Sequence, residues 1–71
     1  MINKQILTQF GKRVRQERDK KGYSQERLGE IAKVHRTYIG MIERAEKNIT
    51  LTNMEKIARA LGKKVNDLVD F

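Results

Sequence analysis

Apolar residues recur every three or four positions along most of the chain, which is the repeat of an α-helix. The first apolar stripe, which includes Phe10 and Val14, predicts a helix over about residues 4–20, and Gly22 is a typical C-terminal stop. Gly11 lies inside this segment and is expected to weaken the helix slightly.

Two short helices are predicted next. Ser24 is a good N-cap for a helix over residues 25–32, whose buried side includes Leu28. No Gly or Pro follows this helix, but the apolar phase shifts. The new stripe, which contains Ile39, predicts a third helix over residues 35–44.

The last third of the chain predicts two more helices. Either Thr50 or Thr52 could cap a helix over residues 51–61, and Thr52 with a Glu three residues later matches a capping box. Gly62 ends this helix, and a last helical turn is expected over residues 66–70.

The composition agrees with an all-α fold of five helices. Proline is absent, and no segment alternates with period two for long. A chain of 71 residues holds one domain, residues 1–71, near the lower limit for a core built only from side chains.

The chain carries a formal net charge of +7, which favours an anionic partner. Nucleic acid fits best, and a membrane surface is the remote alternative. Residues 1–48 hold twelve basic and six acidic side chains, whereas residues 49–71 hold four and three. The partner is therefore expected to contact the first two thirds of the chain.

Several functions lack the residues that they need. There is no cysteine and only one His, so we expect no metal and no cofactor. The nine acidic residues are scattered and form no recognisable set of nucleophile, base and orienting group, so an enzyme is not expected. The N-terminus lacks the apolar run of a signal peptide or membrane span, which predicts a cytoplasmic protein.

A helical wheel of residues 35–44 separates an apolar side from a polar side. The polar side, called the reading face below, consists of Arg36, Thr37, Gly40, Met41 and Arg44. Arg can bridge guanine O6 and N7, Thr can bond either base type, and Met can contact a thymine methyl group. Gly40 would let the backbone approach DNA closely. The alternative is a solvated helix face that happens to hold two arginines.

The two short helices form the kind of bihelical unit that enters a DNA major groove. The run SQERLGEIAKVHRTYIGMIERAEKNIT resembles the Cro/repressor-like (Xre-type) helix-turn-helix family. Within it, HRTYIGMIERAEKNIT is similar to the controller proteins of restriction-modification systems. The resemblance covers roughly residues 8–71 and implies a compact, lambda-repressor-like DNA-binding domain of five helices.

The resemblance also implies DNA contacts. Arg36 and Thr37 match the base-reading pair of controller proteins, and Met41 joins them as a base-reading residue. The resemblance places five residues at the sugar-phosphate backbone or the groove edge: Gln25, Tyr38, Arg44, Lys47 and Asn48. Ser24 and His35 are further candidates for backbone or flanking contacts. Gln25 would bond a phosphate at the positive end of its helix, or it is an ordinary exposed residue. Tyr38 could instead be a half-buried packing residue, and Lys47 a solvated charge.

One pair of charges is assigned to architecture. Arg18 and Glu43 lie at the edges of apolar faces, where an unpaired charge would be costly. The resemblance implies a salt bridge between them that fixes the reading helix on the first helix. A phosphate contact by Arg18 is the lesser option.

Two positions depart from the family pattern. His35 stands where an acidic or hydroxyl cap is usual, so its cap bond is in doubt and a phosphate contact is the alternative. Ala45 stands where Gly is common, so the exit from the third helix is expected to lack the left-handed conformation.

One reading helix specifies only a few base pairs, so we expect a homodimer on a pseudo-palindromic operator. Candidate dimer contacts, some of which could be core, are Leu51, Met54, Val65 and Phe71. The resemblance implies binding to the protein's own promoter, with activation followed by repression. Activation would need a surface for RNA polymerase, for which Glu26 and Glu30 are candidates. A phage-type repressor or an antitoxin of the same fold is the alternative.

Overall fold

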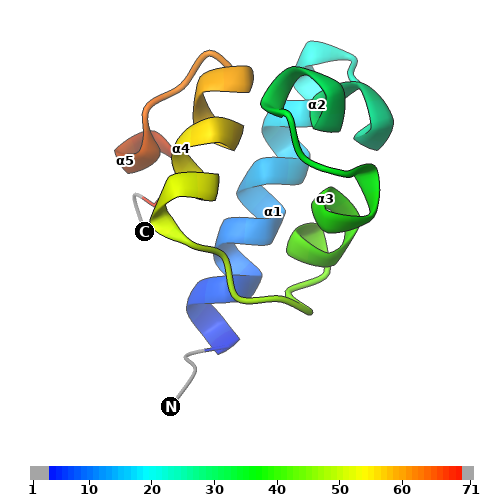
Figure 1. Cartoon of the computed structure of the whole chain (residues 1–71). Helices are drawn as coiled ribbons and strands as arrows, with labels where there is room; N and C mark the ends of the chain where they lie inside the picture. Colours follow the sequence, from blue (N-terminus) through cyan, green and yellow to red (C-terminus); the bar gives the residue numbers. More distant parts are fainter. Residues whose placement is uncertain (1–3, 70–71) are drawn as a thin grey trace.

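The computed structural model describes residues 4–69, and within this range it contains five α-helices and no strand. The helices are α1 (Lys4–Lys21), α2 (Gln25–Ala32), α3 (Arg36–Glu43), α4 (Leu51–Ala60) and α5 (Val65–Leu68), as Figure 1 shows. All five predicted helices are present, in the predicted order, and the all-α prediction is confirmed.

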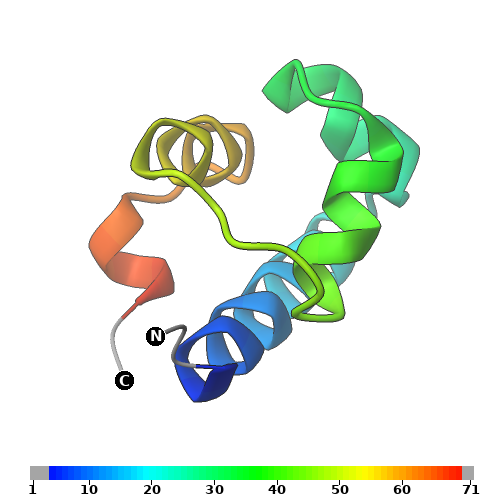
Figure 2. The same ribbon diagram turned by 60° about the horizontal axis from the view of Figure 1, so that its bottom comes forward.

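The five helices surround one shared interior. Helix α1 packs against α3 and α5, and α2 packs against α3 and α4. Figures 1 and 2 show α3 on one side of α1 and α5 on the other. Helix α1 therefore contacts only the inner side of α3 and leaves its outer side uncovered.

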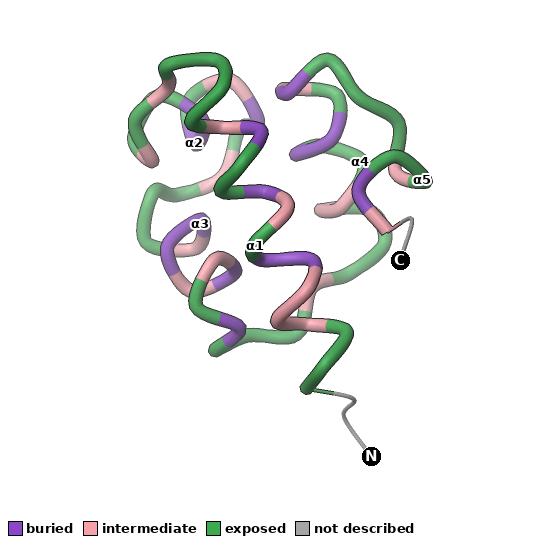
Figure 3. The backbone as a smooth tube through the Cα atoms, turned by 180° about the vertical axis from the view of Figure 1, so that it is seen from behind, coloured by how far each residue is buried: buried purple, intermediate pink, exposed green. Residues whose placement is uncertain are grey.

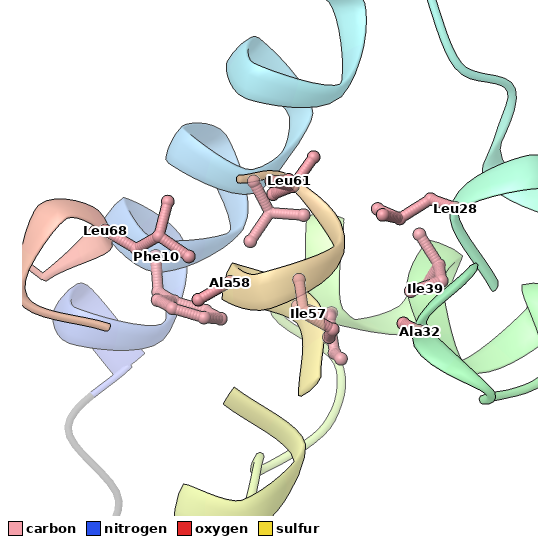
Figure 4. Packing of buried hydrophobic residues seen from close by; sticks show 10 residues of the cluster. Phe10, Leu28, Ala32, Ile39, Ile57, Ala58, Leu61 and Leu68 are labelled. Carbon is pink, nitrogen blue, oxygen red and sulfur yellow. The ribbon is translucent and has the colours of Figure 1, made fainter. Parts of the chain in front are cut away.

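The core takes large apolar side chains from every helix, as the apolar stripes predicted. Phe10 of α1, Leu28 of α2, Ile39 of α3, Ile57 of α4 and Leu68 of α5 are all buried in one cluster (Figure 4). Figure 3 shows that buried positions follow the inner sides of the helices. Removing this apolar surface from water is the main source of stability for a fold of this kind.

The first four helices all end at a residue in the left-handed conformation. These residues are Gly22 (φ 72°), Lys33 (φ 62°), Ala45 (φ 58°) and Gly62 (φ 70°). In each case the next N–H bonds the carbonyl five residues earlier, over 2.8–3.1 Å, which satisfies a carbonyl that the helix leaves open. The sequence predicted the two glycine ends.

The expectation that Ala45 lacks the left-handed conformation was wrong. Ala45 adopts it at φ 58°, and the Glu46 N–H then reaches the Met41 carbonyl over 2.8 Å. The side chain of Ala45 is also buried. This hydrogen bond and the burial of the methyl group offset the cost of the conformation for a residue with a Cβ.

The N-terminal ends of α4 and α5 differ from the predictions, whereas the N-cap of α2 agrees. Ser24 caps α2 as predicted, because its Oγ accepts the Arg27 N–H at 2.9 Å. Thr50 caps α4 by accepting the Asn53 N–H at 3.1 Å, so the capping box at Thr52 was wrong. Helix α5 starts one residue earlier than predicted, and residue 70 of the predicted turn lies outside the described residues.

Replacing Lys33 by Gly is expected to raise the free energy of unfolding by about 0.5–1 kcal/mol, because Gly adopts positive φ without steric cost. Lys33 is exposed, so the substitution removes no buried contact. The matched control is Lys33→Ala, which removes the same charge and keeps a Cβ. Urea unfolding followed by circular dichroism measures both variants. A Gly variant no more stable than the Ala variant would contradict this account.

Candidate nucleic-acid interface

Helix α3 lies unusually close to α1, and glycine permits the approach. A Cβ atom added at Gly11 would overlap the carbonyl oxygen of Ile42 and lie 2.9 Å from that of Glu43. Both obstacles are backbone atoms, which side-chain rotation cannot move away. Gly11 was expected only to weaken α1, but the structure gives it a packing role that its sequence neighbours do not reveal.

The Arg18–Glu43 ion pair implied by the family resemblance is present and fastens α3 to α1. Arg18 Nε and Nη2 donate to the two oxygens of Glu43, at 2.7 and 3.1 Å. The side chains are only 12% and 4% exposed. Arg18 Nη1 also donates to the Tyr23 carbonyl at 2.9 Å. The hydrogen bonds to Glu43 raise the pKa of Arg18 above its usual range, despite its burial.

Gln25 extends this network to the first residue of α2. Its Nε2 donates to Glu43 Oε1 at 3.1 Å, so one carboxylate binds side chains from both α1 and α2. The amide nitrogen has a second hydrogen that this bond does not use. The position of Gln25 relative to α3 is therefore fixed while one donor stays available.

Gly40 on the reading face is covered by side chains. A Cβ atom there would lie 3.0 Å from Arg44 Nη1 and 3.3 Å from Gln25 Oε1. The ends of these two side chains lie over Gly40 in the free protein, and a close approach of DNA to the backbone here stays a prediction. The missing Cβ of Gly40 leaves space for the ends of both side chains.

The N-terminus of α3 is capped by His35, contrary to the doubt that the sequence raised. His35 Nδ1 accepts the Thr37 N–H at 3.0 Å, as an Asp or Ser cap would. An accepting Nδ1 places the proton of a neutral imidazole on Nε2. The exposed ring can therefore donate outward from Nε2 while it caps the helix.

The reading face presents Arg36 and Thr37 as exposed residues and Met41 as a half-buried one. Arg36 Nη1 lies 3.3 Å from Glu26 Oε2, on the first turn of α2. Arg44 Nε lies 3.1 Å from Glu46 Oε2. That hydrogen bond raises the pKa of Arg44 and lowers the pKa of Glu46. Both arginines of the face thus have an acidic neighbour.

Tyr38 has the packing role, one of the two roles that the sequence left open. It is half-buried and packs against the core, and its hydroxyl oxygen accepts a hydrogen bond from Asn53 Nδ2 at 3.0 Å. The hydroxyl proton is not used in that bond and can be donated to another acceptor. Ser24, Lys47 and Asn48 are all exposed.

Comparison with known proteins decides the class of this fold. The helix-turn-helix family profile matches residues 14–68. The chain is 51% identical to control protein C.BamHI of Bacillus amyloliquefaciens over 63 residues, which are 87% of this chain and 78% of that protein. The chain belongs to the helix-turn-helix family. It is a DNA-binding transcription regulator whose relatives include controller proteins of restriction-modification systems.

Two solved structures of helix-turn-helix proteins agree with this assignment. The restriction-modification controller protein C.AhdI from Aeromonas hydrophila is 40% identical with a TM-score of 0.85, over 87% of this chain and 94% of that chain. The biofilm master regulator SinR, known from Bacillus subtilis, was solved in complex with DNA. It is 37% identical with a TM-score of 0.82, over 86% of this chain and 98% of that chain.

The candidate dimer contacts of this helix-turn-helix protein differ in exposure. Leu51 is 72% exposed, which is unusual for a large apolar side chain, whereas Met54 and Val65 are partly buried against the core. Phe71 lies outside the described residues. Ile6 of α1 is 48% exposed. It was not among the predicted contacts, which all lie after the third helix.

Two side-chain contacts near the reading face were not predicted from the sequence. Glu26 contacts Arg36 across ten positions, and Asn53 contacts Tyr38 across fifteen. Neither separation is a neighbour spacing within one helix. The turn between α2 and α3 and the packing of α4 create these contacts, so no local pattern could have found them.

Among residues 4–69, no three His, Asp or Glu side chains gather as ligands for a metal ion. Within the same range, none of the helices combines the length and the apolar character of a membrane span.

Proposed function

We propose that this helix-turn-helix protein is a restriction-modification controller that binds its own promoter region as a homodimer. In this role it activates transcription at low occupancy and represses it at high occupancy, so that endonuclease is made after methylation. The observation that carries the proposal is the exposed pair Arg36 and Thr37 at the start of α3, held on α1 by the Arg18–Glu43 ion pair. The identity to control protein C.BamHI supports the specific role.

In this proposal α3 enters the major groove. Arg36 reads guanine through O6 and N7, Thr37 bonds a neighbouring base, and Met41 contacts a thymine methyl group. The contacts to the sugar-phosphate backbone and groove edge come from Ser24, Gln25, His35, Tyr38, Arg44, Lys47 and Asn48. The unused amide hydrogen of Gln25 and the outward Nε2 of His35 are suited to phosphate oxygens.

A second copy of the chain doubles the sequence that is read. Two α3 helices about 34 Å apart match half-sites one helical turn apart on a pseudo-palindromic operator. The 72% exposed Leu51 is the main proposed dimer contact, with Met54 and Val65 beside the core as lesser candidates. Phe71 remains a further candidate outside the described residues.

Activation adds a contact with RNA polymerase. The acidic candidates Glu26 and Glu30 are exposed on α2, and their partners are Arg36 and Arg27. A repressor or antitoxin of the same fold would bind DNA without such a contact. A reporter driven by the protein's own upstream region separates these roles, because a controller first raises and then lowers expression as its concentration increases.

The test of the proposal is a gel-shift titration at fixed salt with the protein's own upstream DNA and a scrambled duplex. The expected result is selective binding to the upstream DNA in dimer-sized steps. Sedimentation of the free protein gives its oligomeric state in the same buffer. Equal affinity for both duplexes would overturn the proposal that the protein regulates its own promoter.

Replacing Arg36 by Ala is expected to cost about 1–3 kcal/mol on the specific site and to leave nonspecific binding nearly unchanged, because guanine reading is lost. Fluorescence anisotropy with the specific and scrambled duplexes measures both affinities. The matched comparison is Lys47→Ala, which should weaken both duplexes alike and reduce the salt slope by about 1. An equal loss from Arg36→Ala on the two duplexes would mean that Arg36 contacts phosphate only.

A further inference from the structure

Glu26 forms an ion pair with Arg36, the arginine that is proposed to read bases. Its Oε2 lies 3.3 Å from Arg36 Nη1, and both side chains are more than 60% exposed (64% and 63%). Glu26 belongs to the first turn of α2, where the positive end of the helix favours a carboxylate. The contact therefore joins the first turns of the two helices that form the DNA-binding unit.

The contact with Glu26 uses only one of the three nitrogen atoms of the Arg36 guanidinium group. Arg36 donates to Glu26 through Nη1, and its Nε and Nη2 donors make no hydrogen bond to that carboxylate. A guanidinium has five N–H donors, and two adjacent ones are enough to bridge guanine O6 and N7. Reading guanine is therefore compatible with keeping the Glu26 contact.

Binding to a phosphate is affected differently. An unpaired arginine contacts phosphates of any sequence and releases condensed counterions, which produces nonspecific affinity. When Arg36 is paired with Glu26, its charge is partly compensated, and a phosphate that approaches it also meets the carboxylate. The pair thus weakens the sequence-independent contact more than the base contact.

We propose that Glu26 is a specificity-determining residue, which directs Arg36 toward guanine and away from phosphates. The inference rests on the proposed base-reading function of Arg36. It assigns a role to a carboxylate that is otherwise unexpected beside a polyanion. Glu26 acts through Arg36 and needs no contact with DNA of its own.

The experiment compares wild-type protein with Glu26→Gln on specific and scrambled duplexes over a range of salt concentrations. Freeing Arg36 is expected to raise affinity for scrambled DNA up to about fivefold, the scale of an exposed ion pair. The salt slope on scrambled DNA should steepen by about 1, the value for one added phosphate contact. Affinity for the specific site should rise less, so the ratio of the two affinities falls.

Glu30→Gln is the matched control for the loss of one negative charge. Glu30 lies one turn further along α2, is similarly exposed at 61%, and pairs with Arg27 at 3.3 Å instead of with Arg36. It should leave the ratio of specific to nonspecific affinity close to that of the wild type. In an Arg36→Ala background, Glu26→Gln should have no larger effect than Glu30→Gln.

Two results would overturn the role of Glu26: equal effects of Glu26→Gln and Glu30→Gln on the affinity ratio, or a Glu26→Gln effect that persists without Arg36. Failure of the proposed function looks different, because the wild-type protein would then bind upstream and scrambled duplexes equally. The salt slopes on scrambled DNA need no operator and test the release of Arg36 in either case.

Discussion

Replacing Arg18 by Met is expected to lower the free energy of unfolding by about 3–5 kcal/mol, because Glu43 is left as an unpaired buried charge. The Glu43 side chain is only 4% exposed, and Arg18 supplies two of its hydrogen bonds. Small domains have a total stability of only about 5–15 kcal/mol, so this variant should lose a large fraction of its stability. Urea unfolding followed by circular dichroism measures the loss.

Two controls separate the buried charge from other effects of the substitution. The Arg59–Glu55 pair has the same shortest distance, 2.7 Å, but its side chains are 80% and 51% exposed. Arg59→Met should therefore cost only about 0.3–0.5 kcal/mol. Replacing both Arg18 and Glu43 by Met should recover most of the stability, since no charge is stranded. A double variant as unstable as Arg18→Met would show that packing, not charge, explains the loss.

Replacing Gly11 by Ala is expected to destabilise the protein by about 3 kcal/mol, at the upper end of the usual cost of overpacking. The new methyl group would collide with the backbone carbonyl oxygens of Ile42 and Glu43, so α1 and α3 must separate. Alanine normally favours a helix over glycine by about 1 kcal/mol, so the expected sign opposes intrinsic propensity. Thermal unfolding detects the loss directly.

Gly40→Ala is the matched control for this prediction. Gly40 is also buried within a helix, but an added Cβ there meets the ends of two flexible side chains, those of Arg44 and Gln25. The exposed Arg44 side chain can rotate away, and Gln25 Oε1 at 3.3 Å needs only a small shift, so Gly40→Ala should be neutral or stabilising. Equal destabilisation by the two substitutions would contradict the account of close backbone contact at Gly11.

The apolar stripes predicted the core well, because burial leaves a periodic signal in the sequence. Phe10, Leu28, Ile39 and Ile57 are buried as those stripes required. The ends of α1 and α4 were also predicted, since Gly22 and Gly62 mark a left-handed position by residue type alone. Local rules succeed where one residue type has one strong physical preference.

The ends of α2 and α3 carry no such mark. Lys33 and Ala45 adopt the left-handed conformation although residues of either type rarely do so. The left-handed conformation of Lys33 and Ala45 is accompanied by a hydrogen bond across the last turn of each helix. That hydrogen bond cannot be read from the sequence. Thr50 rather than Thr52 caps α4, because Thr50 has the extended backbone of an N-cap (φ −77°, ψ 157°) and Thr52 already lies inside the helix.

The reading face was predicted as a set of residues but not as a network. The exposure of Arg36 and Thr37 followed from the helical wheel. The family resemblance implied the Arg18–Glu43 pair, and the structure contains it. The contacts of Glu26 with Arg36 and of Gln25 with Glu43 depend on how α2 is placed against α3. Predicting such contacts requires the three-dimensional arrangement of the helices.

The shared carboxylate of Glu43 limits how this DNA-binding unit can be transplanted. A protein engineer who grafts only α2 and α3 onto another scaffold would carry Gln25 and Glu43 but leave Arg18 and Gly11 behind. The graft would then hold a buried carboxylate without its cation and a helix without its close support. A portable DNA-binding unit must therefore include α1 as well as α2 and α3.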